Sequence, residues 1–439
     1  MSSDIKPGRL TQQQIDANFA DMHPALSRSE ALIDADRCYF CYDAPCTTAC
    51  PTGIDIPGFI QKIRSGNRQG SAQTILTENI MGGMCARVCP TEVLCEEACV
   101  RNTHEDRPVR IGLLQRYATD EVLEKRIPLF RRAPATGHKV AVVGGGPAGL
   151  SCAHRLAMLG HGVTVFEIRD KLGGLNEFGI AAYKTPDEFA AREVEYILGI
   201  GGIEVRTGVT LGQHVSLPQL RQQYDAVFLG FGLAGVNGLG LEGEQLEGVA
   251  NAVAYIADLR QAGDKAKLPV GRRVVVIGGG MTAIDIAVQS KALGAEEVTL
   301  VYRRGQEHMN ASRYEQEFAQ VRGVTVRTWS KPRRFLVDGK RVRGVEFEST
   351  QNTGEIWVLD ADVVFKAIGQ KVLWQDLADT AQILELEKDR IQVDEERRTS
   401  VRGVWAGGDC IAGGKDLTVS AVQDGKLAAL SIDRFLKEK

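Results

Sequence analysis

The sequence predicts an α/β protein that begins with a separate α-helical domain rich in cysteine. Two observations predict this organisation. A strand–helix–strand pattern occurs twice, at 139–167 and at 273–302, and each time a glycine-rich stretch joins the first strand to the helix. Eight of the ten cysteines fall between Cys38 and Cys99, before the first of these units. With 439 residues, the chain is long enough for two or three domains with cores of their own.

Charge and hydropathy exclude several classes of partner. The formal net charge is −3, so no overall basic field favours nucleic acid or an anionic membrane surface. No apolar stretch reaches the roughly 18 residues that a membrane helix needs. The first residues lack the apolar core of a signal peptide. We therefore expect a cytoplasmic protein without nucleic-acid or membrane contacts.

The first 135 residues carry short helical patterns, such as 57–66 and 111–125, separated by proline and glycine. Their cysteines form two runs, Cys38, Cys41, Cys46 and Cys50 before Pro51, and then Cys85, Cys89, Cys95 and Cys99. A reducing compartment disfavours a disulfide framework, so metal binding is the better interpretation. Close thiolates followed by Cys-Pro are typical of iron–sulfur ferredoxin runs. Structural zinc is one alternative, although such sites usually show two Cys-x-x-Cys pairs and only one is present. Structural thiols that bind no metal are the other alternative.

After a polar linker at 131–138, the first strand–helix–strand unit predicts a dinucleotide site. The strand 139–143 is followed by Gly144, Gly146 and Gly149 in the spacing GxGxxG, and a helix spans 147–160. These glycines allow a tight turn, backbone approach to a pyrophosphate, and close helix–strand packing. Glu167 ends the next strand, where an acid accepts a ribose hydroxyl. The alternative is a purely structural glycine-rich turn.

The second unit repeats this arrangement between the strands 273–277 and 298–302. Gly278, Gly280 and Ala283 give GxGxxA, and Arg303 and Arg304 follow the second strand in place of an acid. An arginine there favours a 2′-phosphate, hence NADPH over NADH. The alternative is that both arginines are solvated surface charges.

The rest of the chain completes the nucleotide-binding part. Alternation over 325–365, with a turn at 338–340, predicts an antiparallel hairpin layer. Near the end, Gly408 and Asp409 follow the strand 404–406 and precede a helix. This element resembles the closing segment of two-dinucleotide flavin reductases, in which the nicotinamide domain is inserted into the flavin domain. Flavin is the required intermediary, because nicotinamide delivers hydride whereas clusters accept single electrons.

The cysteine runs together with the stretch 111–120 resemble the electron-input half of dihydropyrimidine dehydrogenase, in its bacterial form as a separate small subunit. The resemblance covers the chain from about residue 30 to the end. It implies an N-terminal α-helical iron–sulfur domain followed by two nested Rossmann-like domains. The expected ranges are 1–135 for two [4Fe–4S] clusters, 136–268 and 371–439 for FAD, and 269–370 for the nicotinamide coenzyme.

The resemblance also assigns cluster donors. Cys38, Cys41 and Cys46 match three ligands of one cluster, whose fourth is a glutamine at the position of Gln115. The second cluster is matched by Cys50, Cys89, Cys95 and Cys99. Cys85 matches a position that is not a ligand, so we expect a small buried residue there. Without the resemblance, Gln115 is an ordinary helix residue.

For the nucleotides, the resemblance implies two sets of contacts. The FAD set is Gly144, Gly145, Gly146, Pro147, Ala148, Gly149, Glu167, Gly174, Leu175, Lys184, Leu211, Gly408, Asp409 and Thr418. The NADPH or NADH set is Gly278, Gly280, Met281, Thr282, Ala283, Arg303, Arg304, Ala367, Ile368 and Gly369. Asn310 replaces an arginine of the NADPH-using relatives, and 179–184 lacks their proline, so the choice of coenzyme stays open.

The implied function is that of an electron-input subunit. NAD(P)H would reduce FAD, and the clusters would pass electrons to a partner that contains FMN and iron–sulfur clusters and reduces uracil or thymine to the 5,6-dihydropyrimidine. Two copies of each subunit would form a heterotetramer. No residue of this chain is expected to act on the pyrimidine. The rivals are the glutamate synthase small subunit and a non-enzymatic iron–sulfur scaffold or redox sensor.

Overall fold

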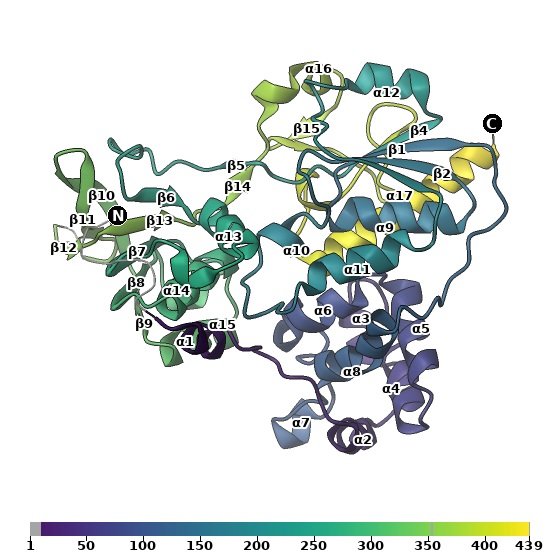
Figure 1. The fold of residues 1–439 in the computed structure, drawn as a ribbon, viewed down its shortest axis with the longest axis horizontal. Coiled ribbons are helices and arrows are strands. Elements are labelled where there is room, and N and C mark those ends of the chain that lie inside the picture. Colours follow the sequence, from purple (N-terminus) through teal and green to yellow (C-terminus); the bar gives the residue numbers. More distant parts are fainter. Residues whose placement is uncertain (1–9, 353, 439) are drawn as a thin grey trace. The chain divides into compact units, whose positions relative to one another are not determined.

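The computed structural model describes residues 10–352 and 354–438, which form two compact units (Figure 1). The larger unit contains residues 23–177, 187–235 and 371–438. The smaller unit contains residues 236–370 together with two short segments, 10–22 and 178–186. Among the described residues, no helix combines the length and apolar character needed to cross a membrane.

The larger unit begins with a bundle of short helices. They are α2 (Arg28–Asp36), α3 (Pro45–Ala49), α4 (Ile56–Arg64), α5 (Arg68–Glu78), α6 (Gly82–Val88), α7 (Asn102–Glu105) and α8 (Ile111–Glu124). Apolar faces of α4, α5 and α8 form its core, with Phe59, Ile75 and Leu114 fully buried. The cysteines lie mostly in the connections, so the helices act as a frame for the thiols.

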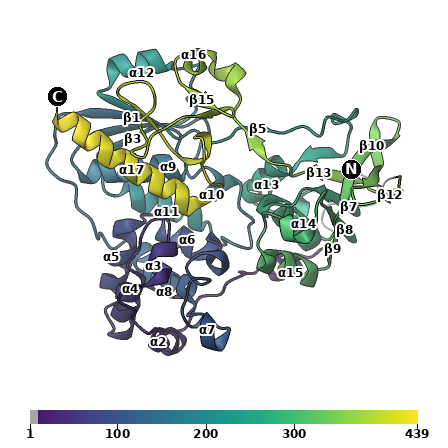
Figure 2. The same ribbon diagram turned by 180° about the vertical axis from the view of Figure 1, so that it is seen from behind.

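The second part of the larger unit is a parallel sheet in the order β17-β4-β1-β2-β3. Its strands are β1 (Lys139–Val143), β2 (Gly162–Phe166), β3 (Ile203–Arg206), β4 (Ala226–Leu229) and β17 (Val404–Ala406). The helices α9 (Pro147–Met158) and α17 (Thr418–Lys437) run side by side on one face (Figure 2). The other face is covered by α12 (Leu217–Gln223). Helix α11 (Phe189–Leu198) contacts both α9 and the bundle helix α6.

The smaller unit repeats the parallel arrangement in the order β6-β13-β7-β8-β9. The strands are β6 (Val249–Asn251), β7 (Arg273–Ile277), β8 (Glu297–Val301), β9 (Val324–Arg327) and β13 (Val363–Lys366). An antiparallel sheet, β10-β11-β12, adds Ser330–Asp338, Arg341–Ser349 and Ile356–Asp360. The helices are α1 (Gln12–Asn18), α13 (Ala252–Gln261), α14 (Met281–Ala292) and α15 (Arg313–Val321).

The predicted fold class is confirmed, including both strand–helix–strand units and the hairpin turn near residue 339. No motif or periodicity in the sequence indicates that residues 10–22 and 178–186 pack with the smaller unit. Asn18 donates its side-chain amide to the Ala292 carbonyl (2.8 Å), and the Met22 N–H donates to the Tyr183 carbonyl (2.9 Å). The main segment of this unit starts at residue 236, so residue 269, the predicted start of the inserted domain, lies inside it.

Candidate cofactor sites

The first glycine loop is shaped by contacts that leave no space for side chains. Gly144 follows β1 with φ of +103°, and a Cβ added there would lie 2.3 Å from the Gly230 carbonyl oxygen. A Cβ at Gly149 would lie 1.9 Å from the Gly144 carbonyl oxygen. Helix α9 starts at Pro147, so its first N–H groups face the loop. The loop is therefore a cradle of bare backbone at the end of a strand.

Glu167 lies where the sequence places it, directly after β2. Its Oε2 accepts a hydrogen bond from the Gly145 N–H (2.7 Å), and its Oε1 accepts one from the Arg169 N–H (2.9 Å). The side chain is buried. The carboxylate thus fixes the loop backbone at the strand end where a ribose is expected.

Distant segments close around this loop. The Gly173 N–H donates to the Gly145 carbonyl (2.8 Å), and a Cβ at Gly174 would lie 2.8 Å from the Gly146 Cα. Leu175, the next residue, starts the short helix α10 (Leu175–Phe178). Thr418, the first residue of α17, donates its hydroxyl to the Asn176 side chain (2.7 Å). These predicted FAD contacts come together around one loop.

Asp409 lies in the one-turn helix Gly408–Cys410 before α17. Burial raises its pKa to about 7, Asp416 and Asp424 add to the rise, and Arg390 opposes it. The Asp424 carboxylate accepts from the Gly408 N–H (2.8 Å) and pairs with Arg397 (2.7 Å). Sequence reasoning missed Asp424; its signal was an acid among the apolar residues of the last helix.

Two residues of the expected FAD set have side chains that other parts of the protein engage. The Leu211 side chain belongs to the sheet core, so only its backbone is available to a ligand. Lys184 lies in the smaller unit, where its ammonium is 2.8 Å from Asp285 and 2.7 Å from Glu315. All three side chains are buried. Burial alone would lower the pKa of Lys184, but the two carboxylates outweigh it and raise that pKa.

The second glycine loop joins β7 to α14. The Gly278 N–H donates to the Val301 carbonyl (3.1 Å), and a Cβ at Gly278 would lie 2.2 Å from the Ala367 carbonyl oxygen. The expected residues Ala367, Ile368 and Gly369 thus lie beside the loop, while no atom lies within 4 Å of a Cβ added at Gly280. Met281, Thr282 and Ala283 form the first turn of α14, with Ala283 buried. Arg303 and Arg304 are exposed after β8.

The cysteine thiols fall into two adjoining neighbourhoods. Burial raises the pKa of Cys46 to about 11, and Cys38 and Cys99 raise it further; Cys38 is likewise raised by burial and then by Cys41 and Cys99. Arg101 explains why Cys99 is near Cys38, because its guanidinium donates to the Arg37 carbonyl (2.6 Å) and lies 3.8 Å from the centre of the Tyr39 ring.

In the second neighbourhood, burial raises the pKa of Cys89, and the thiols of Cys85, Cys95 and Cys50 add to this rise. Burial also raises the pKa of Cys95, with Cys50 and, from the first neighbourhood, Cys46 among the further causes. Within the described residues, no three His, Cys, Asp or Glu side chains converge as ligands of one metal ion.

Gln115 lies on the face of α8 that packs on the second neighbourhood. Its Nε2 donates to the Gly82 carbonyl (2.7 Å) at the start of α6, the helix that leads into Cys89. One turn earlier, the Gly112 N–H donates to Glu96 (2.9 Å), next to Cys95. This arrangement favours a different sorting of the same eight donors from the one that the resemblance implies. Cys99 lies near Cys38 and Cys46, whereas Gln115 contacts α6, the helix that leads into Cys89.

Cys85 is buried, as predicted for this position. Burial raises its thiol pKa, and the neighbouring Asn79 side chain opposes this rise. Next to it, the Glu193 carboxylate of α11 accepts from the N–H groups of Gly83 (2.9 Å) and Met84 (3.0 Å). Burial raises the pKa of Glu193 to about 8. This contact joins the cysteine-bearing bundle to the first nucleotide-binding part.

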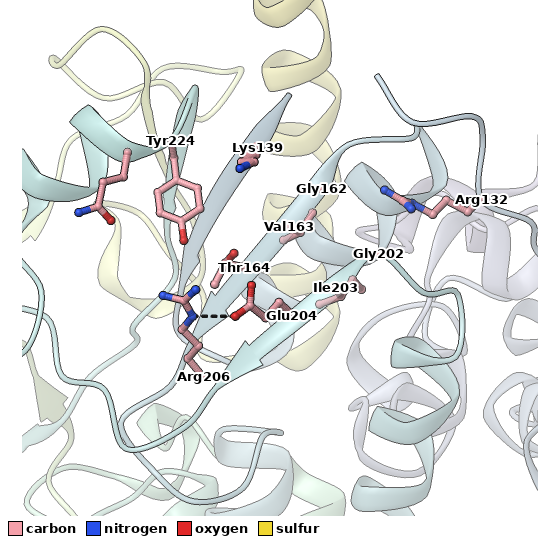
Figure 3. A pocket seen from close by; sticks show the side chains of 11 residues that line it. Arg132, Lys139, Gly162, Val163, Thr164, Gly202, Ile203, Glu204, Arg206 and Tyr224 are labelled. Carbon is pink, nitrogen blue, oxygen red and sulfur yellow. Dashed lines mark hydrogen bonds and ion pairs between the residues drawn. The ribbon is translucent and has the colours of Figure 1, made fainter. Parts of the chain in front are cut away.

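A polar cleft of about 550 Å³ lies at the opposite ends of the strands of the larger unit (Figure 3). Lys139, Gly162 and Gly202 line it at the beginnings of β1, β2 and β3, whereas the glycine loop follows the end of β1. Glu204 and Arg206, both on β3, form an ion pair at 2.9 Å in its lining. The cleft is therefore separate from the first glycine loop.

Comparisons with known proteins cover both parts of the chain. A model of the pyridine nucleotide-disulphide oxidoreductases matches residues 138–425. A model described as dihydropyrimidine dehydrogenase domain II, 4Fe-4S cluster, matches residues 15–127.

Two curated relatives match almost end to end. The NAD-dependent dihydropyrimidine dehydrogenase subunit PreT of Salmonella typhimurium is 34% identical, over 96% of this chain and 98% of its own. The glutamate synthase [NADPH] small chain of Escherichia coli is also 34% identical, over 95% of this chain and 94% of its own. The crystal structure of T. acidophilum thioredoxin reductase, 23% identical, has a TM-score of 0.55 over 68% of this chain and 99% of its own, which supports the fold.

Proposed function

Since the chain belongs to the pyridine nucleotide-disulphide oxidoreductases, as an NAD(P)H-dependent flavoprotein with a 4Fe-4S domain, we propose that it is the electron-input subunit of a dihydropyrimidine dehydrogenase. The observation that carries this proposal is the end-to-end match to PreT. Seven cysteines and Gln115 at the positions that the resemblance assigns to cluster ligands support it. In this role the chain oxidises NAD(P)H and delivers electrons to a partner that holds the pyrimidine site.

The residues around the first glycine loop fit FAD. Gly144, Gly146 and Gly149 leave backbone exposed at the start of α9, Glu167 presents a carboxylate at the end of β2, and Asp409 lies before α17. A bound flavin supplies the conversion between a two-electron hydride donor and one-electron acceptors. The protein's part is to hold the dinucleotide between the strand ends and segments 173–175 and 408–418.

For the clusters, we propose the sorting that the two neighbourhoods support. One [4Fe–4S] cluster takes Cys38, Cys41, Cys46 and Cys99, and the other takes Cys50, Cys89, Cys95 and Gln115. The hydrogen bond from Gln115 Nε2 to the Gly82 carbonyl leaves the amide oxygen as the atom available to iron. Because burial raises the pKa values of Cys38 and Cys46, these thiols give up protons when they bind metal.

Paired cysteine variants test this sorting. The double variant Cys38→Ser/Cys99→Ser should keep one cluster, because both ligands belong to the same one. The double variant Cys38→Ser/Cys89→Ser should lose both. Iron and acid-labile sulfide per flavin are measured after anaerobic purification. Loss of both clusters in the Cys38/Cys99 variant, with one retained in Cys89→Ser/Cys99→Ser, would restore the sorting implied by the resemblance.

The second glycine loop is proposed to bind the nicotinamide coenzyme. Gly278 and Gly280 leave the backbone open at the start of α14, and the segment Ala367–Gly369 lies beside them. Arg303 and Arg304 are the candidates for a 2′-phosphate. The relatives named above include an NAD-dependent and an NADPH-dependent protein.

The partner is proposed to be an FMN- and iron–sulfur-containing subunit, with two copies of each chain in the complex. Co-expression with such a subunit, followed by anaerobic purification, tests both points. We expect uracil-dependent oxidation of NADH or NADPH by the complex, and dye reduction without uracil turnover by this chain alone. Uracil turnover by the single chain would contradict the division of labour, and the mass of the complex checks the stoichiometry.

A glutamate synthase small subunit is the second candidate, because that relative matches with the same identity. It predicts that the chain supports turnover of 2-oxoglutarate plus glutamine when it is supplied with a glutamate synthase large subunit. Side-by-side assays with each partner separate the two functions. Both require the same electron route through this chain.

A further inference from the structure

The segment after β8 is folded tightly around the second glycine loop. The Tyr302 ring packs on Gly279, where an added Cβ would lie 2.5 Å from two ring carbons. The Ala311 N–H donates to the Gly279 carbonyl (3.1 Å). Residues 302–311 are therefore held beside the loop, at the strand end where dinucleotide-binding domains meet the adenosine ribose.

Within this segment the two arginines differ. Arg304 donates through Nε to the Tyr302 hydroxyl (3.0 Å), and that hydroxyl donates to the His308 carbonyl (2.8 Å). The Arg304 carbonyl also accepts from the Trp329 N–H (3.1 Å). Arg303 accepts a hydrogen bond from Thr350 (2.8 Å) through its backbone only. In the described part of the chain, its guanidinium has no hydrogen-bond or ion-pair partner.

A carboxylate lies against Gly305, the residue that follows these arginines. Glu307 turns back onto Gly305, where an added Cβ would lie 2.2 and 2.4 Å from its two carboxylate oxygens. Its ion-pair partner is the neighbouring His308, at 3.4 Å, and both side chains are more than half exposed. The segment thus carries the unpaired guanidinium of Arg303 and the carboxylate of Glu307 within five residues of sequence.

We propose that Arg303 and Glu307 set the coenzyme preference in opposite directions, while Arg304 is a positioning residue that braces the segment through Tyr302. The inference rests on the proposed function, since it takes the second loop as the nicotinamide coenzyme site. A 2′-phosphate is attracted by the Arg303 guanidinium and repelled by the Glu307 carboxylate. A 2′-hydroxyl carries no charge, and Glu307 is able to accept its hydrogen bond.

Binding of adenosine fragments to the purified FAD- and cluster-containing protein tests this directly. Calorimetry gives Kd for 2′,5′-ADP, which carries the 2′-phosphate, and for ADP, which lacks it. Removing the exposed charge in Glu307→Gln should tighten 2′,5′-ADP about fivefold, and Arg303→Ala should weaken it about tenfold. For both variants Kd for ADP should change less than about twofold. The gain in affinity for 2′,5′-ADP in Glu307→Gln should shrink as salt is added, because salt screens the repulsion that the substitution removes.

Tyr302→Phe distinguishes the brace from a direct ligand, because it breaks the Arg304 hydrogen bond but keeps the arginine's charge. If Arg304 acts by positioning, Tyr302→Phe and Arg304→Ala should have similar effects on both fragments, and both should lower the melting temperature. If Arg304→Ala weakens only 2′,5′-ADP, as Arg303→Ala does, and Tyr302→Phe changes nothing, the brace is disproved.

Matched controls are Glu317→Gln and Arg343→Ala, which remove exposed charges on α15 and β11 of the same unit. Both should bind the two fragments as the unmodified protein does. An unchanged ratio of the two Kd values in Glu307→Gln would overturn the role of Glu307. If the unmodified protein binds neither fragment, the coenzyme assignment itself fails, which is a separate result.

Discussion

The two glycine loops start from the same strand–helix–strand pattern but are completed in different ways. In the larger unit, distant segments such as 173–175 and 408–418 close around the first loop, and Gly425 of α17 lies against the backbone of α9. In the smaller unit, the segment 302–311, which directly follows β8, covers the second loop. A loop enclosed by remote parts of the chain suits a nucleotide that stays bound, whereas a locally covered loop suits one that exchanges.

The helices after the loops are also anchored differently. Helix α9 packs on α17 so closely that a Cβ at Gly425 would lie 2.1 Å from the Ala148 carbonyl oxygen. Helix α14 is instead anchored to segment 178–186 by ion pairs. Lys184 of that segment pairs with Asp285 of α14 and with Glu315 of α15. The same motif is thus stabilised by close backbone packing in one unit and by a buried ion-pair cluster in the other.

Lys184→Met should show the largest effect of this difference. It leaves two carboxylates buried without their cation, so we expect the smaller unit to lose about 3–5 kcal/mol of unfolding free energy. Denaturant unfolding checks this against the exposed control Lys331→Met. Burial already raises the pKa of Asp285. In the variant, which lacks the Lys184 ammonium, protonation of the Asp285 carboxylate removes its buried charge. The deficit should therefore shrink as pH falls from 8 to 5, and a pH-independent deficit would contradict this account.

Gly149→Ala tests the enclosed loop. The new methyl group would meet the Gly144 carbonyl at 1.9 Å, so we expect roughly 1–3 kcal/mol of lost stability and a protein purified with little flavin. Gly280→Ala, at the second motif position of the other loop and with open space around its added Cβ, is the control. It should leave flavin content and stability nearly unchanged. Equal flavin loss in both variants would remove the distinction between the loops.

Glu167→Gln should have a smaller effect, confined to the larger unit. The amide still reaches the Gly145 N–H, but the charge-assisted hydrogen bond of 2.7 Å and the ionic acceptor for a ribose are lost. We expect FAD to bind about tenfold more weakly, as measured by titrating flavin into the flavin-free protein. Glu204→Gln, at an exposed ion pair in the same sheet, is the control. A normal FAD affinity would exclude a role for the Glu167 charge.

Ala283→Gly should give the smallest change. It restores the third glycine of the motif in the second loop, where the alanine side chain is already buried without conflict. The cost should be about 1 kcal/mol, from the lower helix propensity of glycine, and coenzyme binding should not improve. Thermal unfolding and calorimetry with ADP check both. Tighter binding would mean that the second loop is a compromised copy of the first.

Sequence reasoning placed both glycine loops, their strands and the terminal Glu167 correctly, because hydrophobic runs and glycine spacing are local signals. It nominated eight cluster donors, but their spacing alone could not divide them between two clusters. Which thiols are neighbours depends on how α8 lies against α6 and on Arg101 joining residues far apart in the chain. For the same reason it could not see that Lys184 pairs with Asp285 and Glu315, which lie more than 100 residues further along.

The division of the chain into units also constrains how the protein is made. Asn18 of α1 bonds to Ala292, so α1 is synthesised before its partner, which lies 274 residues later in the chain. The cysteine-bearing helices of residues 28–124 are complete long before that. Domains generally form in the order of synthesis, so the metal-binding part is ready early while α1 remains unpaired. Cluster insertion during translation would then precede assembly of the smaller unit.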